Sequence, residues 1–481
     1  MTLGIEAFGA YVPIYRLKRQ EIARAWSTGA PPGEKSVANF DEDTITMAVA
    51  AAMDCLHATD IGTIDGCYFA TNSSPFTEKQ GAALIATALN LRREVSTIDF
   101  TDSLRCGTTA MKCAFDAVKA GSSNKILLVV AESRLGAPRS EFEQSCGDGA
   151  VAFLIGNERP VVVVKASYTH GDEIFDVWKG NKEEFLRTHE DRFVLTQGYF
   201  ANVQEAVSKI MERQKVTNND FAKVCIYGPD SRRHRELVKK LGFDLKTQVQ
   251  DQLLNEVGNT GASLALMMLV SALEQSQPND KILLASYGSG CDAFIFETTP
   301  EIGRVKGRLG IEGHLASKRY LASYEKYIMF RQLMVTDAGR RPYLVSSPTV
   351  LWRDRKWVLG FSATRCLDCG RLFFPPQRVC YYCRSKDNFE YVPLAKRQGT
   401  IYSFTKDNLA QCPDPPEVFA TVHLDDVRVF CRMTDRDPDN ISIGMPVEMT
   451  FRRIHEGGGY PNYFWKCMPM RKTADAVKES K

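Results

Sequence analysis

The sequence predicts an α/β fold built on a duplicated core, followed by a small metal-binding lobe and a small all-β barrel. Three observations support this: strand-like and helix-like segments alternate over residues 1–300, one order of elements occurs twice, and four cysteines cluster near residue 370. Alternating strands and helices are typical of buried sheets covered by helices. At 481 residues the chain is too long for one ordinary core, so we expect two or three domains.

The repeated unit has the order helix, strand, turn, strand. Both copies carry the letters Lys-Ile-Leu-Leu in their first strand, and both helices follow a glycine. Because the order of elements recurs together with the letters, we interpret the pattern as a duplication rather than a chance match. The first copy comprises a helix ending at Gly121 and strands over 125–131 and 150–155; the second comprises a helix opening at 258–261 and strands over 280–284 and 292–296.

The composition excludes several functional classes. The net charge of +3 gives no electrostatic case for nucleic acid or a membrane surface as a partner. No apolar run approaches the ~20 residues that a membrane span needs, and the N-terminus lacks the pattern of a signal peptide. Of the 14 cysteines, the ten outside the cluster near residue 370 are scattered through apolar stretches, which is typical of a reducing cytosol, so we predict a cytoplasmic protein.

Four cysteines form the clearest chemical motif. They lie in two Cys-x-x-Cys knuckles separated by ten residues, a spacing that can enclose one tetrahedral zinc ion. A shell of four thiolates leaves no open position for a substrate, so we predict one structural Zn²⁺ and no catalytic role for it. The predicted ligands are Cys366, Cys369, Cys380 and Cys383.

The segments around the knuckles complete the predicted organisation. Residues 301–355 form a connector with an amphipathic helix over 318–334, and the zinc lobe occupies 356–395. Short alternating runs over 396–471 indicate a small all-β barrel, with a charged tail over 472–481. The four runs singled out as strands are 399–405, 418–424, 427–433 and 445–451.

Four stretches within residues 1–300 carry a family likeness: Lys35-Ser-Val-Ala-Asn-Phe-Asp-Glu-Asp-Thr, Gly147-Asp-Gly-Ala, Gly258-Asn-Thr and Ser286-Tyr-Gly-Ser-Gly. Through them, residues 1–300 resemble the thiolase superfamily, most closely the 3-hydroxy-3-methylglutaryl-CoA (HMG-CoA) synthase branch. The resemblance implies a duplicated α-β-α-β-α core, a homodimer and an acyl-CoA substrate, with coenzyme A as part of that substrate.

The C-terminal part of the sequence contains the motif Arg365-Cys-x-x-Cys-Gly together with Phe374-Pro-Pro. Through this motif, residues 356–471 resemble the DUF35 module, which is a rubredoxin-like zinc ribbon followed by an OB-fold. In the superfamily such modules are partners of the thiolase-like subunit and help to form the acyl-CoA site. In this chain the two parts are fused.

The catalytic triad implied by the family is altered at every position. An ungapped register puts Leu104 at the nucleophile position, and Cys106 follows two residues later. Asn72 stands where the family has its acid/base Glu, and Tyr227 stands where it has a His. The Asn of the Gly-Asn-Thr motif remains as Asn259.

Each candidate residue has a functional and a structural interpretation. Cys106 is near a helix N-terminus, which favours a thiolate. It lies two residues after the nucleophile position, however, and two residues along a helix rotate a side chain by about 200° to another face, so we prefer a packing role for it. The phenol of Tyr227 could donate a proton or a hydrogen bond to a substrate oxygen, or it could be structural. The predicted substrate-binding residues are Arg232 and Arg233, which could meet a phosphate, and Ser286 and Gly288 of the Tyr-Gly-Ser-Gly turn.

Three functions remain open from sequence. We favour a thiolase-like aldolase that cleaves a β-hydroxyacyl-CoA by a retro-aldol reaction and needs no acyl-cysteine. The second is an HMG-CoA synthase-like acyltransferase in which Cys106 carries the acyl group. The third is a non-catalytic acyl-CoA-binding subunit.

Overall fold

The computed structural model describes residues 2–180, 182–189, 191–305, 307–335 and 345–471, and a nine-stranded sheet lies at its centre. The strand order is β11-β12-β13-β8-β1-β7-β6-β4-β5. In chain order these strands are β1 (Gly4–Tyr11), β4 (Gly66–Ala70), β5 (Ser96–Phe100), β6 (Ile126–Ser133), β7 (Asp148–Gly156), β8 (Val162–Gly171), β11 (Lys223–Ile226), β12 (Lys281–Tyr287) and β13 (Gly290–Thr298).

The two halves of this sheet repeat one pairing scheme, which confirms the predicted duplication. In the first half β4 pairs in parallel with β6, and β6, β7 and β1 follow in antiparallel order. In the second half β11 pairs in parallel with β12, and β12, β13 and β8 follow in antiparallel order. The halves meet where β1 pairs with β8.

Two helices that begin at equivalent points of the halves lie beside this sheet. Helix α4 (Cys106–Lys119) packs on β4, β6 and β7, and α9 (Leu264–Leu273) contacts β11 and β12 of its own half and β1 and β7 of the other. All ten residues of α9 are buried. Its sequence, apolar at every position except Ser271, is therefore that of an internal helix rather than an amphipathic surface helix.

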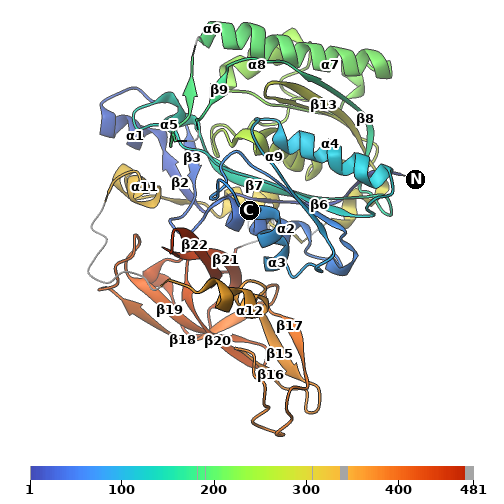
Figure 1. The fold of residues 1–481 in the computed structure, drawn as a ribbon. Coiled ribbons are helices and arrows are strands. Elements are labelled where there is room, and N and C mark those ends of the chain that lie inside the picture. The colour runs from blue at the N-terminus through green and yellow to red at the C-terminus, as the bar shows by residue number, and fades with distance from the viewer. Residues whose placement is uncertain (1, 181, 190, 306, 336–344, 472–481) are drawn as a thin grey trace.

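Other helices cover the outer surfaces of the sheet. Helix α7 (Ala201–Gln214) packs on β8, β12 and β13, and α2 (Thr44–Cys55) packs on β1, β6 and β7 (Figure 1). The remaining elements up to Arg304 are β2 (Tyr15–Lys18), α1 (Arg19–Trp26), β3 (Glu34–Val37), α3 (Gly81–Ala88), α5 (Glu141–Ser145), β9 (Val177–Trp178), β10 (Arg187–Thr188), α6 (Asp191–Phe193) and α8 (Ser231–Lys240), with short 3₁₀ or π segments over 61–63, 194–200, 218–220, 261–263 and 300–304.

The connector contains a shorter helix than the sequence predicted. In place of one helix over 318–334, strand β14 (Arg319–Tyr320) pairs in parallel with β2, and α11 spans only Tyr324–Phe330. The Ser323 hydroxyl accepts a hydrogen bond from the Lys326 backbone N–H and so fixes the start of α11. The connector also contains α10 (Gly310–Ala316) and α12 (Pro348–Val358).

The C-terminal part is a three-stranded ribbon and a closed five-stranded barrel, as predicted. The barrel order is β18-β19-β20-β22-β21, and it lies with the ribbon on one side of the sheet domain (Figure 1). The predicted strands are present, and β22, which sequence analysis did not single out, closes the barrel against β20 and β21. The strands are β15 (Ser362–Cys366), β16 (Leu372–Phe373), β17 (Phe389–Pro393), β18 (Gly399–Asp407), β19 (Glu417–Leu424), β20 (Val427–Met433), β21 (Pro446–Gly457) and β22 (Tyr460–Pro469). The predicted tail over 472–481 lies outside the described residues.

A buried network of charges joins the barrel to the sheet domain. The Arg452 guanidinium, whose side chain is only 1% exposed, contacts Asp435 of the barrel at 2.8 Å and Glu42 of the sheet domain at 2.6 Å. Lys466 contacts Asp41 at 2.8 Å. Asp41 and Glu42 belong to the Lys35–Thr44 motif quoted above. Removing one member of such a network strands its partner as a buried, unpaired charge, so this interface is costly to disrupt.

Candidate active site

The start of α4, the end of β6 and the Asn259 loop come together at one place in the sheet domain. Asn72, just after β4, approaches the start of α4: its Nδ2 lies 3.7 Å from Cys106 Sγ and 2.9 Å from the Ser103 carbonyl oxygen. The structure thus brings two of the predicted catalytic residues, Asn72 and Cys106, into contact.

Cys106 is the first residue of α4 and is only 3% exposed. Burial raises the pKa of its thiol well above the usual range, and the nearby Glu132 carboxyl adds to the rise. A hydrogen bond from the Gly107 backbone and the charge of Arg134 act in the opposite direction without overcoming the burial. The thiol is therefore protonated and shielded, which is unfavourable for a nucleophile.

The loop before α4 is held against the Tyr-Gly-Ser-Gly turn. The Gly288 carbonyl oxygen accepts hydrogen bonds from Ser103 Oγ at 3.0 Å and from Arg105 Nε at 2.7 Å. A Cβ on Gly288 would lie 2.7 Å from the Arg105 backbone nitrogen and 2.8 Å from Leu104 Cβ. Gly288 therefore permits a close backbone approach that positions Leu104 and Cys106, because any side chain there would displace the loop.

Two charged residues that sequence analysis missed lie at the end of β6. Glu132 is fully buried, and its carboxylate accepts hydrogen bonds from the Asn72 side chain at 2.9 Å and from Ser73 Oγ at 2.6 Å. Burial raises the pKa of Glu132, while Arg134 and these hydrogen bonds oppose the rise. The available signal was the run Glu-Ser-Arg directly after an apolar strand.

Tyr227 and Asn259 form the second pair of predicted residues that the structure brings together. Asn259 Nδ2 donates a hydrogen bond to Tyr227 Oη at 3.1 Å. Burial raises the pKa of Tyr227, and both the Asn259 hydrogen bond and the charge of Arg134 oppose that rise. Tyr227 is thus a neutral phenol near pH 7. Among the described residues, no acceptor is found for its own hydrogen.

Two further tyrosines flank Tyr227. Tyr199 donates a hydrogen bond to the Tyr227 carbonyl oxygen at 2.8 Å, and the rings of Tyr227 and Tyr287 lie 6.4 Å apart. Tyr287 Oη and Asp176 Oδ2 are both buried, and the Asp176 carboxylate lies close to the Tyr287 hydroxyl. Burial and the Asp176 charge raise the pKa of Tyr287. These three rings make an aromatic wall on the Asn259 side of the site.

The predicted substrate-binding residues are dispersed. Ser286 is buried in β12, where it pairs with Asp292 of β13. Arg232 is exposed in the first turn of α8, and the neighbouring Arg233 forms an ion pair with Asp230 at 2.8 Å. Of this predicted group, Gly288 lies against the loop that leads into α4.

The four predicted zinc ligands converge in the ribbon. The sulfur atoms of Cys366, Cys369, Cys380 and Cys383 all lie within 4.8 Å of one another. The Cys366–Cys383 and Cys369–Cys380 sulfur pairs are each 3.6 Å apart. A tetrahedral zinc with Zn–S bonds of about 2.3 Å places its sulfurs about 3.8 Å apart, so these residues fit the ion.

The two knuckles share one backbone design. The backbone N–H of Gly370 donates to the Cys366 carbonyl oxygen at 2.8 Å, and that of Arg384 donates to the Cys380 carbonyl oxygen at 2.9 Å. Both Gly370 and Arg384 have positive φ, at 75° and 68°. Each knuckle is thus a tight turn that directs its two sulfurs to the same side.

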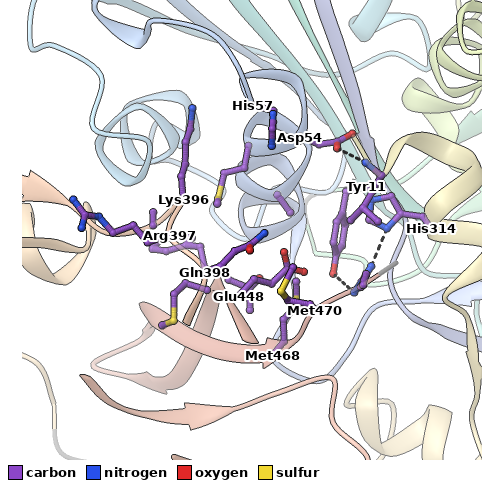
Figure 2. Close-up of a pocket in the computed structure, with 18 of the residues that line it drawn as sticks. Tyr11, Asp54, His57, His314, Lys396, Arg397, Gln398, Glu448, Met468 and Met470 are labelled. Atoms are coloured by element: carbon purple, nitrogen blue, oxygen red, sulfur yellow. Dashed lines mark hydrogen bonds between the residues drawn. The ribbon is translucent and has the colours of Figure 1, made fainter. Parts of the chain in front are cut away.

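A cavity lies away from this chemistry, between the sheet domain and the barrel (Figure 2). Its volume is about 240 Å³. On one side Arg471 donates hydrogen bonds to His314 Nδ1 at 2.8 Å and to Tyr11 Oη at 3.2 Å. None of the predicted catalytic residues lines it. The residues labelled around it are Tyr11, Asp54, His57, His314, Lys396, Arg397, Gln398, Glu448, Met468 and Met470.

Family models match three regions of the chain. Residues 211–296 match the 3-oxoacyl-[acyl-carrier-protein] synthase III C-terminal domain. Residues 360–390 match the rubredoxin-like zinc ribbon domain of ChsH2, and residues 391–452 match the ChsH2 C-terminal OB-fold domain. No helix in the described part of the chain has the length and apolarity of a membrane span.

Relatives and solved structures agree on the sheet domain. The hydroxymethylglutaryl-CoA synthase of Caldivirga maquilingensis is 31% identical over 346 residues, which cover 69% of this chain and 99% of that protein. The enzyme of the same name from Methanopyrus kandleri is 29% identical over 341 residues, 69% of this chain and 97% of that protein.

A crystal structure of HMG-CoA synthase complexed with CoA matches with a TM-score of 0.63 and 21% identity, covering 72% of this chain and 95% of that one. PksG, an HMG-CoA synthase from Bacillus subtilis, matches with a TM-score of 0.62 and 23% identity, covering 69% and 89%. These two likenesses concern the fold. On the strength of the Caldivirga relative, the chain belongs to the hydroxymethylglutaryl-CoA synthase family, and it carries a zinc ribbon and an OB-fold at its C-terminal end.

Proposed function

We propose that this protein is a thiolase-like aldolase that cleaves a β-hydroxyacyl-CoA without an acyl-cysteine intermediate. The observation that carries the proposal is the Tyr227–Asn259 pair. Because the phenol oxygen accepts a hydrogen bond from Asn259, the phenol hydrogen is left for another acceptor, and hydrogen bonds in such a chain strengthen one another. The buried thiol of Cys106 offers no comparable reactivity.

The retro-aldol cleavage needs a base and a hydrogen-bond donor, and residues of this site can supply both. A base takes the proton of the β-hydroxyl, the electron pair of the Cα–Cβ bond moves to Cα, and Cβ becomes an aldehyde or ketone carbonyl. The thioester fragment leaves as an enolate, which takes up at Cα the proton that the base removed from the β-hydroxyl. We assign the enolate oxygen to the Tyr227 hydroxyl as hydrogen-bond donor, and the base role to Glu132, whose carboxylate is a stronger base because burial raises its pKa.

Coenzyme A is then part of the substrate, and the zinc ion has a separate, structural role. The relatives named above are HMG-CoA synthases, and one neighbouring structure is complexed with CoA, which supports an acyl-CoA ligand for this chain. Zinc bound by the four cysteines would stabilise the ribbon that leads into the barrel. No step of the reaction passes through it.

One observation favours a second function, an acyltransferase that uses Cys106. Asn72 Nδ2 lies 3.7 Å from the sulfur at the N-terminus of α4, an arrangement that could assist a thiolate if substrate binding altered the burial. Product analysis separates the two. A panel of β-hydroxyacyl-CoA thioesters should give an aldehyde or ketone and a shortened acyl-CoA for the aldolase. Formation of a longer acyl-CoA from two thioesters would favour the acyltransferase, and binding without turnover would favour a non-catalytic subunit.

A homodimer is proposed alongside this function. Strand β5 forms one outer edge of the sheet and pairs only with β4 among the described strands. Its Ile98 is 37% exposed. Light scattering coupled to size exclusion should give twice the chain mass of 53.8 kDa, and a monomer mass at all concentrations would contradict the proposal.

A further inference from the structure

Arg331, the residue that follows α11, reaches the candidate active site from the connector. Its side chain is 8% exposed and forms an ion pair with Asp148 at 2.6 Å. Its two terminal nitrogens also donate hydrogen bonds to Ser133, one to Oγ at 2.9 Å and the other to the carbonyl oxygen at 3.2 Å. Ser133 is the last residue of β6 and directly follows Glu132. The guanidinium therefore holds the end of β6 beside the proposed base.

Ser133 is also connected to the Glu132 carboxylate through a hydrogen-bond chain. The Ser133 backbone N–H donates to Ser73 Oγ at 2.9 Å, and Ser73 Oγ donates to Glu132 at 2.6 Å. The Asn72 backbone N–H donates to the same carboxylate at 3.0 Å. A displacement of Ser133 would thus shift both the backbone of Glu132 and one of the donors that orient its carboxylate.

The other end of α11 is tied to the barrel. Lys326, in the first turn of this helix, contacts Asp414 at 2.7 Å and donates a hydrogen bond to the Pro413 carbonyl oxygen at 3.0 Å. Asp414 also contacts Arg436 of the barrel at 2.5 Å. Three of the seven residues of α11 are buried, so a displacement at one end of this packed helix is transmitted to the other.

We infer that Arg331 is a positioning residue for the Glu132 carboxylate, and that the barrel supports this role by holding α11. The inference rests on the proposed function, in which Glu132 takes the proton of the β-hydroxyl. A base must lie within hydrogen-bond reach of that proton, and a misplacement by ~1 Å can lower a rate about 100-fold. The planar guanidinium suits the role because its fork fixes direction as well as distance. Arg331 acts through Ser133 and not on the reacting atoms.

Amide hydrogen exchange of the full chain tests the placement without a substrate. The backbone N–H groups of Asn72 and Ser133 report on it, because each donates to a side chain of the hydrogen-bond chain. In Arg331→Gln both should exchange about 10-fold faster, the effect of weakening one hydrogen bond. Lys326→Gln should give a smaller increase. The control Arg353→Gln, at an exposed arginine of α12, should leave both rates unchanged.

Kinetics separate a positioning role from a purely structural one. Arg331→Lys keeps a charge opposite Asp148, so the fold should survive, but it loses the fork that holds Ser133. For a β-hydroxyacyl-CoA that the protein cleaves, kcat should fall about 10- to 100-fold while KM stays nearly unchanged.

The pH profile of kcat should change in the same variant. Burial raises the pKa of Glu132, while the charge of Arg134 and the Ser73 hydrogen bond oppose the rise. Weakening the Ser73 contact raises the pKa further. Because a base acts in its deprotonated form, the acid limb of the profile should move to higher pH.

Four results would count against the inference or its basis. Unchanged exchange at Asn72 and Ser133 in a folded Arg331→Gln variant would overturn it, and so would a loss of kcat with an unchanged pH profile in Arg331→Lys. Unchanged exchange in Lys326→Gln would overturn the role of the barrel. If Arg331→Gln does not fold, the same exchange measurement on Arg331→Lys decides the question. Faster exchange in the variants, without any retro-aldol product from the unaltered protein, would contradict the proposed reaction and leave the positioning by Arg331 intact.

Discussion

Asn259 donates a hydrogen bond to the phenol of Tyr227 over 3.1 Å, which joins the loop before α9 to the end of β11. The Asn259 side-chain oxygen in turn accepts from the Gly261 backbone N–H at 2.9 Å. With its oxygen engaged, the amide can present only its N–H₂ group to Tyr227. The orientation of the phenol is therefore set by the backbone of the loop that leads into α9, within the same half of the duplicated sheet.

Tyr227→Phe should lower turnover by about 10²-fold or more, because it deletes the proposed donor and keeps the buried ring. Tyr168→Phe, which removes a tyrosine hydroxyl from β8, is the matched control and should keep full activity. Both variants are compared for turnover of the same β-hydroxyacyl-CoA and for melting temperature. Unchanged turnover in a folded Tyr227→Phe variant would contradict the assignment.

No stable acyl adduct should form at Cys106, because its thiol is buried and protonated. Intact mass spectrometry after incubation with acetyl-CoA or propionyl-CoA checks this. Cys106→Ala should cost much less activity than Tyr227→Phe, and Cys113→Ala, an exposed cysteine on the same helix, provides the control. An adduct mapped to Cys106, or the reverse ranking of the two variants, would establish the acyltransferase instead.

Cys369→Ser should lower zinc content and destabilise the C-terminal part, since metal-binding free energy contributes directly to folding of such a lobe. Zinc is measured by elemental analysis of the purified protein, and stability by thermal unfolding. Cys412→Ser alters a cysteine outside the cluster and should keep one zinc per chain. Equal metal content in both variants would show that the site is wrongly assigned.

The stability of the protein should fall in acid as Asp41 takes up a proton. Burial by itself would raise the pKa of Asp41, but Lys466 and Arg452 bring it down from 3.8 to about 2. Because the folded pKa lies below the unfolded one, the stabilisation is complete above pH 4 and is lost as the pH falls through about 2. Its size is about 2 kcal/mol.

Urea unfolding at a series of pH values measures this dependence. Asp41→Asn should be less stable at pH 7 than the unaltered protein. Its free energy of unfolding should also fall less steeply as the pH is lowered from 4 to 2. The control Asp439→Asn, at an exposed aspartate of the barrel domain, should follow the unaltered curve. A variant curve with the same slope between pH 4 and pH 2 would mean that other carboxyls dominate the acid response.

Local sequence patterns were sufficient to predict much of the fold, but they predicted less of the candidate active site. The repeated Lys-Ile-Leu-Leu strands and the cysteine spacing are short-range signals, and both led to the observed β6, β12 and zinc cluster. Strand β22 was missed because prolines near its ends and the buried Lys466 break the alternating pattern. The burial of the Lys466 charge is explained by Asp41, which lies 425 positions away in the sequence and accepts a hydrogen bond from it.

The same limit applies to the active site. The departures from the family triad at Leu104, Asn72 and Tyr227 can be seen in the sequence alone. Arg134 carries no such signal, because an arginine after a strand is ordinarily exposed. Its burial depends on Gly261, which is 127 positions further along the chain and leaves room for it.

The buried charge network between the barrel and the sheet domain also bears on how the protein behaves at low concentration. When two such parts are separate chains, their association falls with dilution. Here a connector within one chain holds the two parts together at a constant effective concentration. Separating them within the chain would also break the buried ion pairs of Arg452, which costs free energy. The one-to-one ratio of the two parts is therefore built into the polypeptide and needs no matched expression of two partners.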